Sequence, residues 1–309
     1  MQNNLAFVFP GQGSQSLAML ADFSDHEVVQ NTFSEASDAL GYDLWQLVQQ
    51  GPVEKLNQTN FTQPALLTAS VAIWRLWQAS SSVKPTILAG HSLGEYSALV
   101  CAGVFSLADA VKLVEKRGEF MQASVPAGTG AMYAIIGLAD DKIIEACAQA
   151  AQGEVVSAVN FNSPGQVVIA GNKAAVERAG ELCKEAGAKR ALPLPVSVPS
   201  HCALMKDAAD KLAEELNNIT FNMPNISVVN NVDVAIESSA QAIKTALIKQ
   251  LYSPVRWTET IQYLAQNGVE QVIEAGPGKV LQGLLKRIDK TISCQSVNDS
   301  ASLTKALES

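Results

Sequence analysis

The segment Gly90-His91-Ser92-Leu93-Gly94 constrains the fold of this chain more than any other feature. It follows a short apolar run, Thr86–Ala89, that is typical of a buried strand, and an apolar helix pattern continues from it to about Cys101. A serine between two glycines, placed between a strand and a helix, is typical of a nucleophile elbow, because the glycines permit the sharp turn that exposes the serine Oγ. The alternative is an ordinary tight turn whose serine caps the helix.

Strands and helices alternate on both sides of this segment. Leu5–Phe9 is predicted as a buried strand, and a glycine-rich loop follows it. A helix is predicted from a Thr62 cap through Leu66, Ala69, Ile73 and Leu76. Late in the chain, Ile226–Val229 and Gln271–Glu274 are predicted as strands. This alternation predicts a three-layer α/β domain with a mostly parallel sheet.

The middle of the chain has a different order of elements, strand-helix-strand-strand-helix-strand. The six segments are Ala131–Ile136, Asp140–Ala150, Val155–Phe161, Val167–Ala170, Lys173–Ala186 and Lys189–Leu194. That order predicts a ferredoxin-like subdomain. We therefore expect residues 1–127 and 198–309 to form one large α/β domain, with residues 128–197 inserted into it and a cleft between the two parts.

Composition and charge exclude several classes of protein. The chain has 309 residues, of which 48% are hydrophobic, and 22 basic against 30 acidic residues give a net charge of −8. An acidic chain of this kind is a poor nucleic-acid binder. No apolar stretch is long enough to span a membrane, the N-terminus does not resemble a secretory signal, and five scattered cysteines give neither a disulfide framework nor a metal site. We expect a soluble, cytoplasmic protein without a metal.

A nucleophilic serine needs a base, and the chain has only three histidines. His26 lies in a charged segment that we expect at the surface, and His91 is too close to Ser92 along the chain to aim at it. His201 lies at the edge of the predicted insertion, where the cleft should be, so it is the favoured base by elimination; the alternative is a core histidine. No acidic residue stands out as its partner, and a backbone carbonyl could hold the ring instead.

Arg117 is the most informative charged residue. Its helix is predicted from a Ser106 cap to about Val125, and the spacing places Arg117 at the border of the buried face. Its guanidinium either reaches out to solvent or meets an anion such as the carboxylate of a substrate. The spacing alone does not decide between the two.

Several motifs together resemble the malonyl-CoA:acyl carrier protein transacylases, in particular the discrete bacterial enzymes of type II fatty acid synthesis. The likeness covers nearly the whole chain in order, and its motifs are Phe9–Gln15, Gly90–Tyr96, Arg117-Gly118, Gly130–Met132, Asn160–Gln166, Val196–His201, Gln250-Leu251, Pro254-Val255, Trp257 and Glu274–Gly278. The resemblance implies a hydrolase-like α/β domain with a ferredoxin-like insertion. This agrees with the pattern of strands and helices above.

The resemblance also implies roles for individual residues. Ser92 would be the nucleophile, His201 its general base, and the backbone carbonyl of Gln250 the group that orients the histidine. Arg117 would pair with the malonyl carboxylate. The remaining site residues would be the backbone N–H groups of Gln12 and Leu93 as the oxyanion hole, His91 and Asn162 as supporting polar groups, and Met132 beside the acyl group, where pocket volume decides between malonyl and methylmalonyl.

The activity implied is a ping-pong transfer of the malonyl group from malonyl-CoA to the phosphopantetheine thiol of acyl carrier protein. CoA is then a substrate, and no cofactor or metal is required. Carrier proteins of this pathway are acidic, so a local basic patch is expected, with Lys189-Arg190 and Lys286-Arg287 as candidates. The alternatives are a serine hydrolase or thioesterase with the same Ser92 and His201, and a carrier-binding module with a dead site. A monomer is the default expectation.

Overall fold

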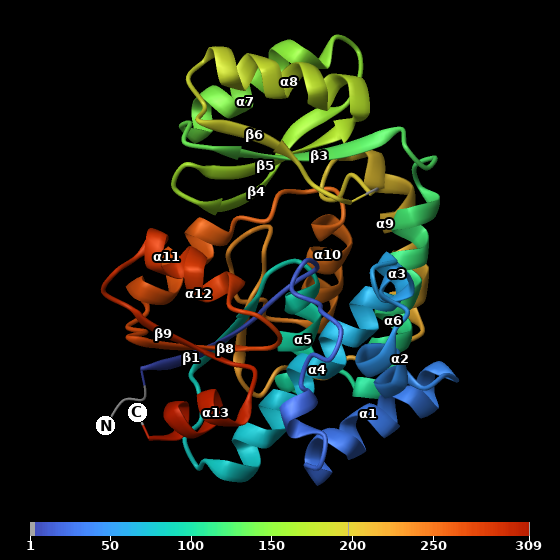
Figure 1. Ribbon diagram of the computed structural model, residues 1–309, viewed down its shortest axis with the longest axis vertical. Coiled ribbons are helices and arrows are strands. Elements are labelled where there is room, and N and C mark those ends of the chain that lie inside the picture. The colour runs from blue at the N-terminus through green and yellow to red at the C-terminus, as the bar shows by residue number, and fades with distance from the viewer. Residues whose placement is uncertain (1–3, 197, 309) are drawn as a thin grey trace.

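The computed structural model describes residues 4–196 and 198–308. The chain forms two sheets with helices packed around them (Figure 1). The lower, larger part of the molecule contains a five-stranded sheet and both the first and the last described elements, and the upper, smaller part contains a four-stranded sheet built from the middle of the chain. This is the predicted mixed α/β architecture.

The larger sheet is parallel throughout, with the strand order β7-β2-β1-β8-β9. Its strands are β1 (Leu5–Phe9), β2 (Ile87–Gly90), β7 (Ser227–Val229), β8 (Gln271–Ala275) and β9 (Ser293–Val297). The first two are buried along their whole length, as expected of parallel strands with helices on both faces. Strand β9 was not predicted, because its sequence Ser-Cys-Gln-Ser-Val lacks an apolar run.

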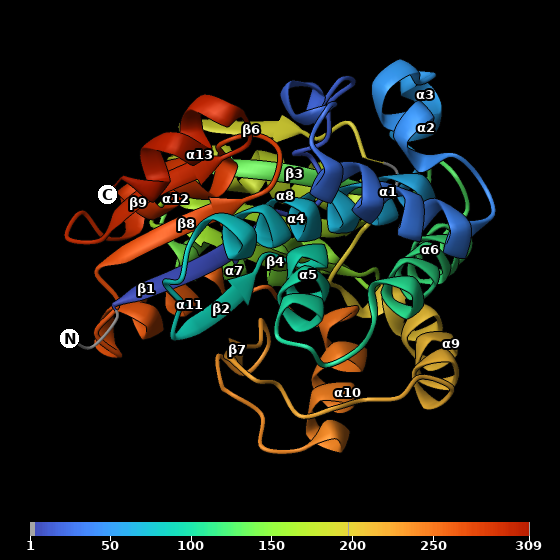
Figure 2. The same cartoon turned by 90° about the horizontal axis from the view of Figure 1, so that it is seen from below.

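Two hydrophobic cores lie on opposite faces of this sheet. Because side chains alternate along a strand, Leu5, Phe7 and Phe9 of β1 face one core, and Ala6 and Val8 face the other. The helices of the first face include α1 (Glu27–Leu40), α2 (Leu44–Gln50), α3 (Val53–Leu56), α4 (Thr59–Ser80), α5 (Leu93–Cys101), α6 (Leu107–Ala123), α9 (Lys206–Asn217), α10 (Ala240–Gln250) and α13 (Ser300–Leu307). The second face holds α11 (Trp257–Gln266) and α12 (Val280–Ile288). Figure 2 shows β1, β2 and β8 side by side, with α4 and α5 next to them.

Helix α4 begins at Thr59, so the predicted cap at Thr62 is wrong. The Thr62 hydroxyl donates instead to the carbonyls of Leu56 and Gln58, inside the first turns. Pro64 lies within the helix as well, and its missing N–H leaves the carbonyl of Asn60 without the usual helical partner. Threonine often caps a helix, but the chain is already helical when it reaches Thr62.

The smaller sheet is antiparallel, with the order β4-β5-β3-β6. Its elements are β3 (Gly130–Ile136), α7 (Asp140–Ala151), β4 (Val156–Ser163), β5 (Gln166–Asn172), α8 (Lys173–Glu185) and β6 (Arg190–Pro193). Helices α7 and α8 pack on one face of the sheet and share a core of their own with it. The order is that of the predicted ferredoxin-like unit; the proposed boundary at residue 197 falls outside the described residues.

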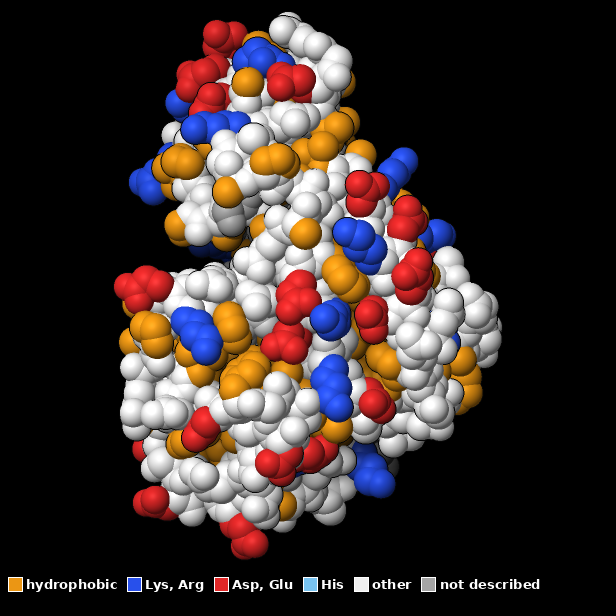
Figure 3. Space-filling model, turned by 90° about the vertical axis from the view of Figure 1, so that its right-hand side faces the viewer, with side chains coloured by type: hydrophobic (Ala, Val, Ile, Leu, Met, Phe, Trp, Pro, Cys, Tyr) orange, Lys and Arg blue, Asp and Glu red, His pale blue; other side chains and the backbone are white. Residues whose placement is uncertain are grey.

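The other face of the smaller sheet positions the functional site. Met132, Val168 and Ala170 from this face pack against Cys202, which directly follows His201 in the chain. Figure 3 shows the surface hollowed between the small upper part and the body of the molecule. The carboxyl ends of β1 and β2 therefore meet the open face of the second sheet across a cleft, where ligands of parallel sheets bind.

Candidate active site

Ser92 lies at the tight turn between β2 and α5, as predicted. Its backbone has φ 53° and ψ −108°, a conformation that non-glycine residues rarely adopt. A Cβ at Gly90 would lie 1.9 Å from the carbonyl carbon of Gly94, and a Cβ at Gly94 would lie 2.0 Å from the carbonyl oxygen of Phe9. The close packing therefore requires both glycines of the elbow, which fixes Ser92 at the mouth of the cleft.

Asn231 clamps this turn from the other side. Its Oδ1 accepts a 2.7 Å hydrogen bond from the N–H of Ser92, and its Nδ2 donates a 2.7 Å hydrogen bond to the carbonyl of Gly90. A single buried amide thus satisfies a donor and an acceptor of the strained turn. The sequence analysis missed Asn231, because it lies in a polar loop after β7 that reads as an ordinary turn.

The imidazole of His201 connects the serine to the backbone of α10. The Nε2 atom lies 2.8 Å from Oγ of Ser92, and the Nδ1 atom lies 2.6 Å from the backbone carbonyl of Gln250. A carbonyl can only accept, so Nδ1 carries the proton and Nε2 accepts from the serine hydroxyl. Burial, with the nearby charge of Arg117, lowers the pKa of His201 to about 3, which keeps the ring neutral. The backbone carbonyl occupies the position where an acid would stand in a triad.

Arg117 of α6 is buried, with only 1% of its surface exposed, so it does not reach out to solvent. Its Nη1 donates to Oε1 of Gln63 at 2.8 Å, and its Nη2 donates to Oε1 of Gln250 at 3.0 Å and to Oγ of Ser92 at 3.3 Å. The guanidinium also lies over the ring of Tyr96, 5.2 Å from its centroid. Within the described residues no carboxylate lies within 4.0 Å of it. A buried cation next to the nucleophile, held by neutral groups, is a site for an anion.

A pocket of about 110 Å³ opens beside these groups. Its lining combines Ser92, His201 and Arg117 with residues from both parts of the molecule: Gln12, His91, Leu93, Met121, Met132, Asn160, Leu194, Val196, Val198 and Ser200. Polar groups line it together with the apolar side chains of Met132 on β3 and of Leu194, Val196 and Val198 in the segment after β6. The pocket therefore suits a small acyl group that ends in an anion.

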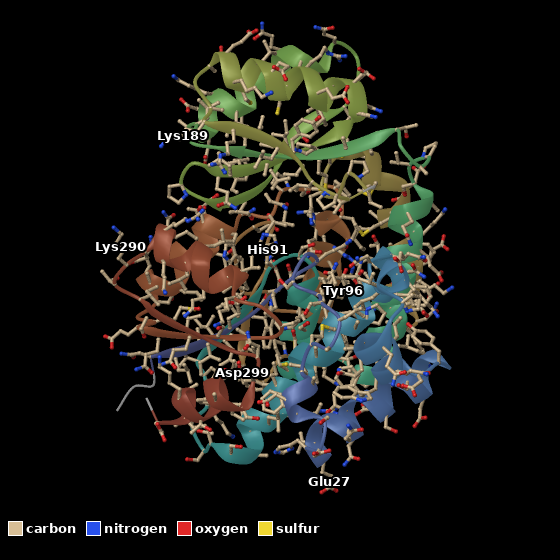
Figure 4. The ribbon with its side chains drawn as sticks, viewed as in Figure 1. Glu27, His91, Tyr96, Lys189, Lys290 and Asp299 are labelled. Carbon is tan, nitrogen blue, oxygen red and sulfur yellow. The ribbon has the colours of Figure 1, made fainter. Side chains whose placement is uncertain are left out.

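The structure places the predicted supporting residues at different depths. His91 and Met132 line the pocket, and Figure 4 shows His91 near the middle of the molecule, below the smaller sheet. Asn162 is not among the residues that line the pocket. Its Oδ1 accepts a 2.8 Å hydrogen bond from Nε2 of His91, so Asn162 holds a residue of the pocket wall from behind. Asn160, two residues earlier on β4, contributes to the pocket wall instead.

Two backbone amides of the pocket wall are available to an oxyanion. Leu93 is the first residue of α5, where N–H groups lack partners within the helix. Gln12 lies in the loop after β1, and its side chain donates to Thr59 at 3.3 Å, which fixes that loop on α4. The N–H of Ser92 itself is taken by Asn231. Gln12 and Leu93 both line the pocket together with Ser92.

A metal-binding cluster and a membrane-spanning helix are both absent from residues 4–196 and 198–308. No group of three His, Cys, Asp or Glu side chains comes together there as a metal site would require. In the same part of the chain, no helix is both long enough and apolar enough to cross a membrane.

Comparison with known proteins identifies the family. Residues 6–305 match the model of the acyl transferase domain. The chain is 65% identical to the malonyl CoA-acyl carrier protein transacylase of Escherichia coli K12 over 304 residues, and 66% identical to that of Haemophilus influenzae over 305 residues. In both cases the alignment covers 98% of this chain and 98% of the relative.

Solved structures give the same result. The acyl carrier protein S-malonyltransferase of Vibrio cholerae superposes with a TM-score of 0.96 at 68% identity, over 98% of this chain and 99% of that one. A malonyl-transacylase in complex with its type II PKS acyl-carrier protein superposes with a TM-score of 0.97 at 66% identity, again over 98% and 99%. The chain therefore belongs to the acyl transferase domain family and, within it, to the malonyl CoA-acyl carrier protein transacylases.

Proposed function

We propose that this chain transfers the malonyl group of malonyl-CoA to the phosphopantetheine thiol of acyl carrier protein, through a malonyl ester on Ser92. The observation that carries the proposal is the position of Arg117. Its guanidinium lies 3.3 Å from Oγ of Ser92, which itself lies 2.8 Å from Nε2 of His201. A nucleophile, its base and a buried cation for the substrate carboxylate share one small pocket.

In the first half-reaction Oγ of Ser92 attacks the thioester carbonyl, and Nε2 of His201 takes the hydroxyl proton. The carbonyl of Gln250 stabilises the imidazolium that forms, because it accepts from Nδ1. The N–H groups of Gln12 and Leu93 stabilise the oxyanion of the tetrahedral intermediate. The carbon–sulfur bond then breaks, and the CoA thiolate leaves with the proton from His201.

The second half-reaction reverses these roles. His201 deprotonates the phosphopantetheine thiol, the sulfur attacks the malonyl ester of Ser92, and the serine oxygen leaves and recovers its proton from His201. CoA and carrier protein use the same cleft in turn, which is a ping-pong sequence. CoA is a substrate in this scheme, and no bound cofactor takes part.

Arg117 couples recognition of the acyl group to the strength of the base. Its charge is one of the causes of the low pKa of His201, and it donates to the same Ser92 oxygen that must attack. A malonyl carboxylate on the guanidinium offsets that charge and competes for its donor groups. We infer that the substrate carboxylate strengthens both the base and the nucleophile, whereas an acetyl group leaves both weak.

The alternative within the same site is hydrolysis of a thioester. It would use Ser92 and His201 equally, but it gives the buried Arg117 no role with neutral acyl chains. Incubation with malonyl-CoA and holo carrier protein separates the two. We expect one malonyl carrier protein to form for each CoA released. One free malonate for each CoA released would contradict the transferase.

The carrier protein needs a basic surface near the cleft, and one cation of each predicted pair lies where α12 meets the smaller sheet. Arg287 of α12 donates to Gln166 of β5, and Gln166 and Arg190 both pair with Ile136 in the smaller sheet. Lys189 and Lys290 lie on the same side of the molecule, above and below the cleft (Figure 4). We infer that Lys189, Arg190, Lys286 and Arg287, hereafter the cleft cations, bind the acidic carrier.

We further propose the division into residues 1–127 and 198–309 for the large domain and 128–197 for the insertion. The separate core beneath α7 and α8 supports it. A cytoplasmic location is also proposed, because all five cysteines are free, as is usual in a reducing compartment. We also propose that the chain supplies fatty acid synthesis, although one similar structure is a malonyl-transacylase bound to a type II PKS acyl-carrier protein.

A further inference from the structure

Behind the site lies a buried acid that the reaction scheme does not use. Glu95 of α5 has 2% of its surface exposed, and two hydrogen bonds end on its Oε2 atom. One comes from Nε2 of Gln250 at 2.8 Å, and the other comes from the backbone N–H of Asn231 at 3.0 Å. Glu95 therefore holds both the residue whose carbonyl orients His201 and the residue that clamps the Ser92 turn.

The side chain of Gln250 also connects this acid to the buried cation. Its Oε1 accepts from Nη2 of Arg117 at 3.0 Å while its Nε2 donates to Glu95. The amide thus lies between a positive and a negative group and is oriented by both. Within the described residues, Glu95 is the buried carboxylate that faces Arg117; the other fully buried one, Glu274, accepts instead from the N–H groups of Leu281 and Gln282 at the start of α12.

We propose that Glu95 is a positioning residue whose negative charge, acting through the Gln250 amide, sets the affinity of Arg117 for the carboxylate of the substrate. The inference rests on the proposed role of Arg117. An anionic Glu95 offsets part of the guanidinium charge and weakens its attraction for malonyl; a neutral Glu95 leaves that charge fully available.

Glu95 can change its charge without breaking the network. Both accepted bonds end on one oxygen, so a proton on the other oxygen leaves them in place. Burial raises the pKa of Glu95 to about 7. The hydrogen bonds from Gln250 and Asn231 and the charge of Arg117 oppose this rise, because they stabilise the ionised form. The other groups facing it are Tyr96, whose pKa is raised to about 12 so that it stays neutral, and Glu237, whose charge adds to the rise.

The direction of the pH dependence follows. Above a pH of about 7 Glu95 is ionised, and below it Glu95 is neutral. Malonyl binding should therefore weaken as the pH rises from 6 to 8.5. Acetyl-CoA lacks the carboxylate but shares every other titrating group of the ligand, so the ratio of the two dissociation constants isolates this effect.

The test uses the full-length chain with Ser92→Ala, which blocks turnover, with and without Glu95→Gln. Glutamine keeps an oxygen for both accepted bonds and removes only the charge. Titration calorimetry with malonyl-CoA and acetyl-CoA at pH 6, 7 and 8.5 gives the ratio. At pH 8.5 Glu95→Gln should raise the preference for malonyl-CoA by roughly three- to tenfold, and it should abolish the pH dependence of that preference.

A matched control is Glu274→Gln, which neutralises the other fully buried carboxylate, whose pKa burial also raises to about 7. It should leave the ratio and its pH dependence unchanged. If Glu95→Gln behaves like this control, or weakens both ligands equally, Glu95 is only a structural element and the proposal is wrong. If the parent shows no preference for malonyl-CoA at any pH, the role of Arg117 itself fails.

Discussion

Arg117 donates a hydrogen bond to Oγ of Ser92 across 3.3 Å, so the group that would bind the substrate carboxylate touches the nucleophile. The separation leaves room for a short acyl chain only. In the proposed complex a malonyl group would reach from a thioester carbon at Ser92 to a carboxylate on the guanidinium, so the substrate would be recognised by charge and by length together.

Replacing Arg117 by alanine should separate malonyl from acetyl transfer. We expect kcat/KM for malonyl-CoA to fall on the order of 100-fold or more, because the carboxylate would lose a buried charge partner. Acetyl transfer should be kept or improved, since the charge that lowers the pKa of His201 is gone. Arg75→Ala is the control, because Arg75 forms a half-buried ion pair with Glu35. Equal losses for both substrates would argue against a carboxylate site.

The clamp on the elbow predicts that Asn231→Ala impairs both stability and acylation. Two buried backbone groups, the carbonyl of Gly90 and the N–H of Ser92, would lose their partner, at a cost of about 1–3 kcal/mol each in the free energy of unfolding. Displacement of the nucleophile should slow malonylation by roughly 100-fold. Its neighbour Asn230 is equally buried but bonds to Glu237 and its own loop. Asn230→Ala should destabilise the protein while leaving the rate of malonylation near that of the parent.

The pH dependence of acylation should reflect the low pKa of His201. Only the neutral imidazole accepts the serine proton, and a pKa of about 3 keeps it neutral throughout the range above pH 5. Burial, the largest cause of the low pKa, persists when malonyl-CoA offsets the charge of Arg117. At saturating malonyl-CoA the rate of the acylation burst, measured by rapid quench, should therefore stay constant from pH 5 to 8. A loss of rate with a midpoint near 6.5, the ordinary histidine value, would show that the imidazole is not held neutral.

The cleft cations predict an effect on one substrate alone. Replacing all four cleft cations by glutamate should raise KM for holo carrier protein by about tenfold. The same change should leave KM for malonyl-CoA near its original value. The four residues are Lys189, Arg190, Lys286 and Arg287. Lys206→Glu with Lys211→Glu provides the control, because α9 lies on the opposite side of the molecule in Figure 1. Unchanged carrier kinetics in the fourfold variant would place the carrier elsewhere.

The sequence predicted most of the fold because several of its strands, such as β1 and β2, are short apolar runs bounded by glycine or proline, whereas β9 has no such signal. It also indicated Ser92 by the elbow and His201 by the scarcity of histidines. The spacing of Arg117 left two roles open, and only the family resemblance decided between them. The depth of Arg117 was not predictable, because spacing places it only at the border of the buried face. Its burial depends on Gln63 and Gln250, which lie 54 and 133 residues away along the chain.

The partners that hold the site together were harder to find for the same reason. Asn231 contacts Ser92 across 139 residues and sits in a loop whose composition predicts only a turn. Glu95 was visible as part of the motif Gly90–Tyr96, but one acidic residue in a helix is ordinarily solvated. Nothing in the pattern indicates that it faces Gln250. Contacts of this range form only when segments far apart in the sequence pack against each other.

The most direct test of the account is the covalent intermediate itself. The pure protein is mixed with malonyl-CoA without an acceptor, quenched in acid and weighed intact, with Ser92→Ala as the control. We predict one malonyl group per chain, mapped by peptide analysis to Ser92, absent from the control and cleared when holo carrier protein is added. Release of free malonate without any adduct, or an adduct that persists in the control, would contradict a malonyl-serine transferase.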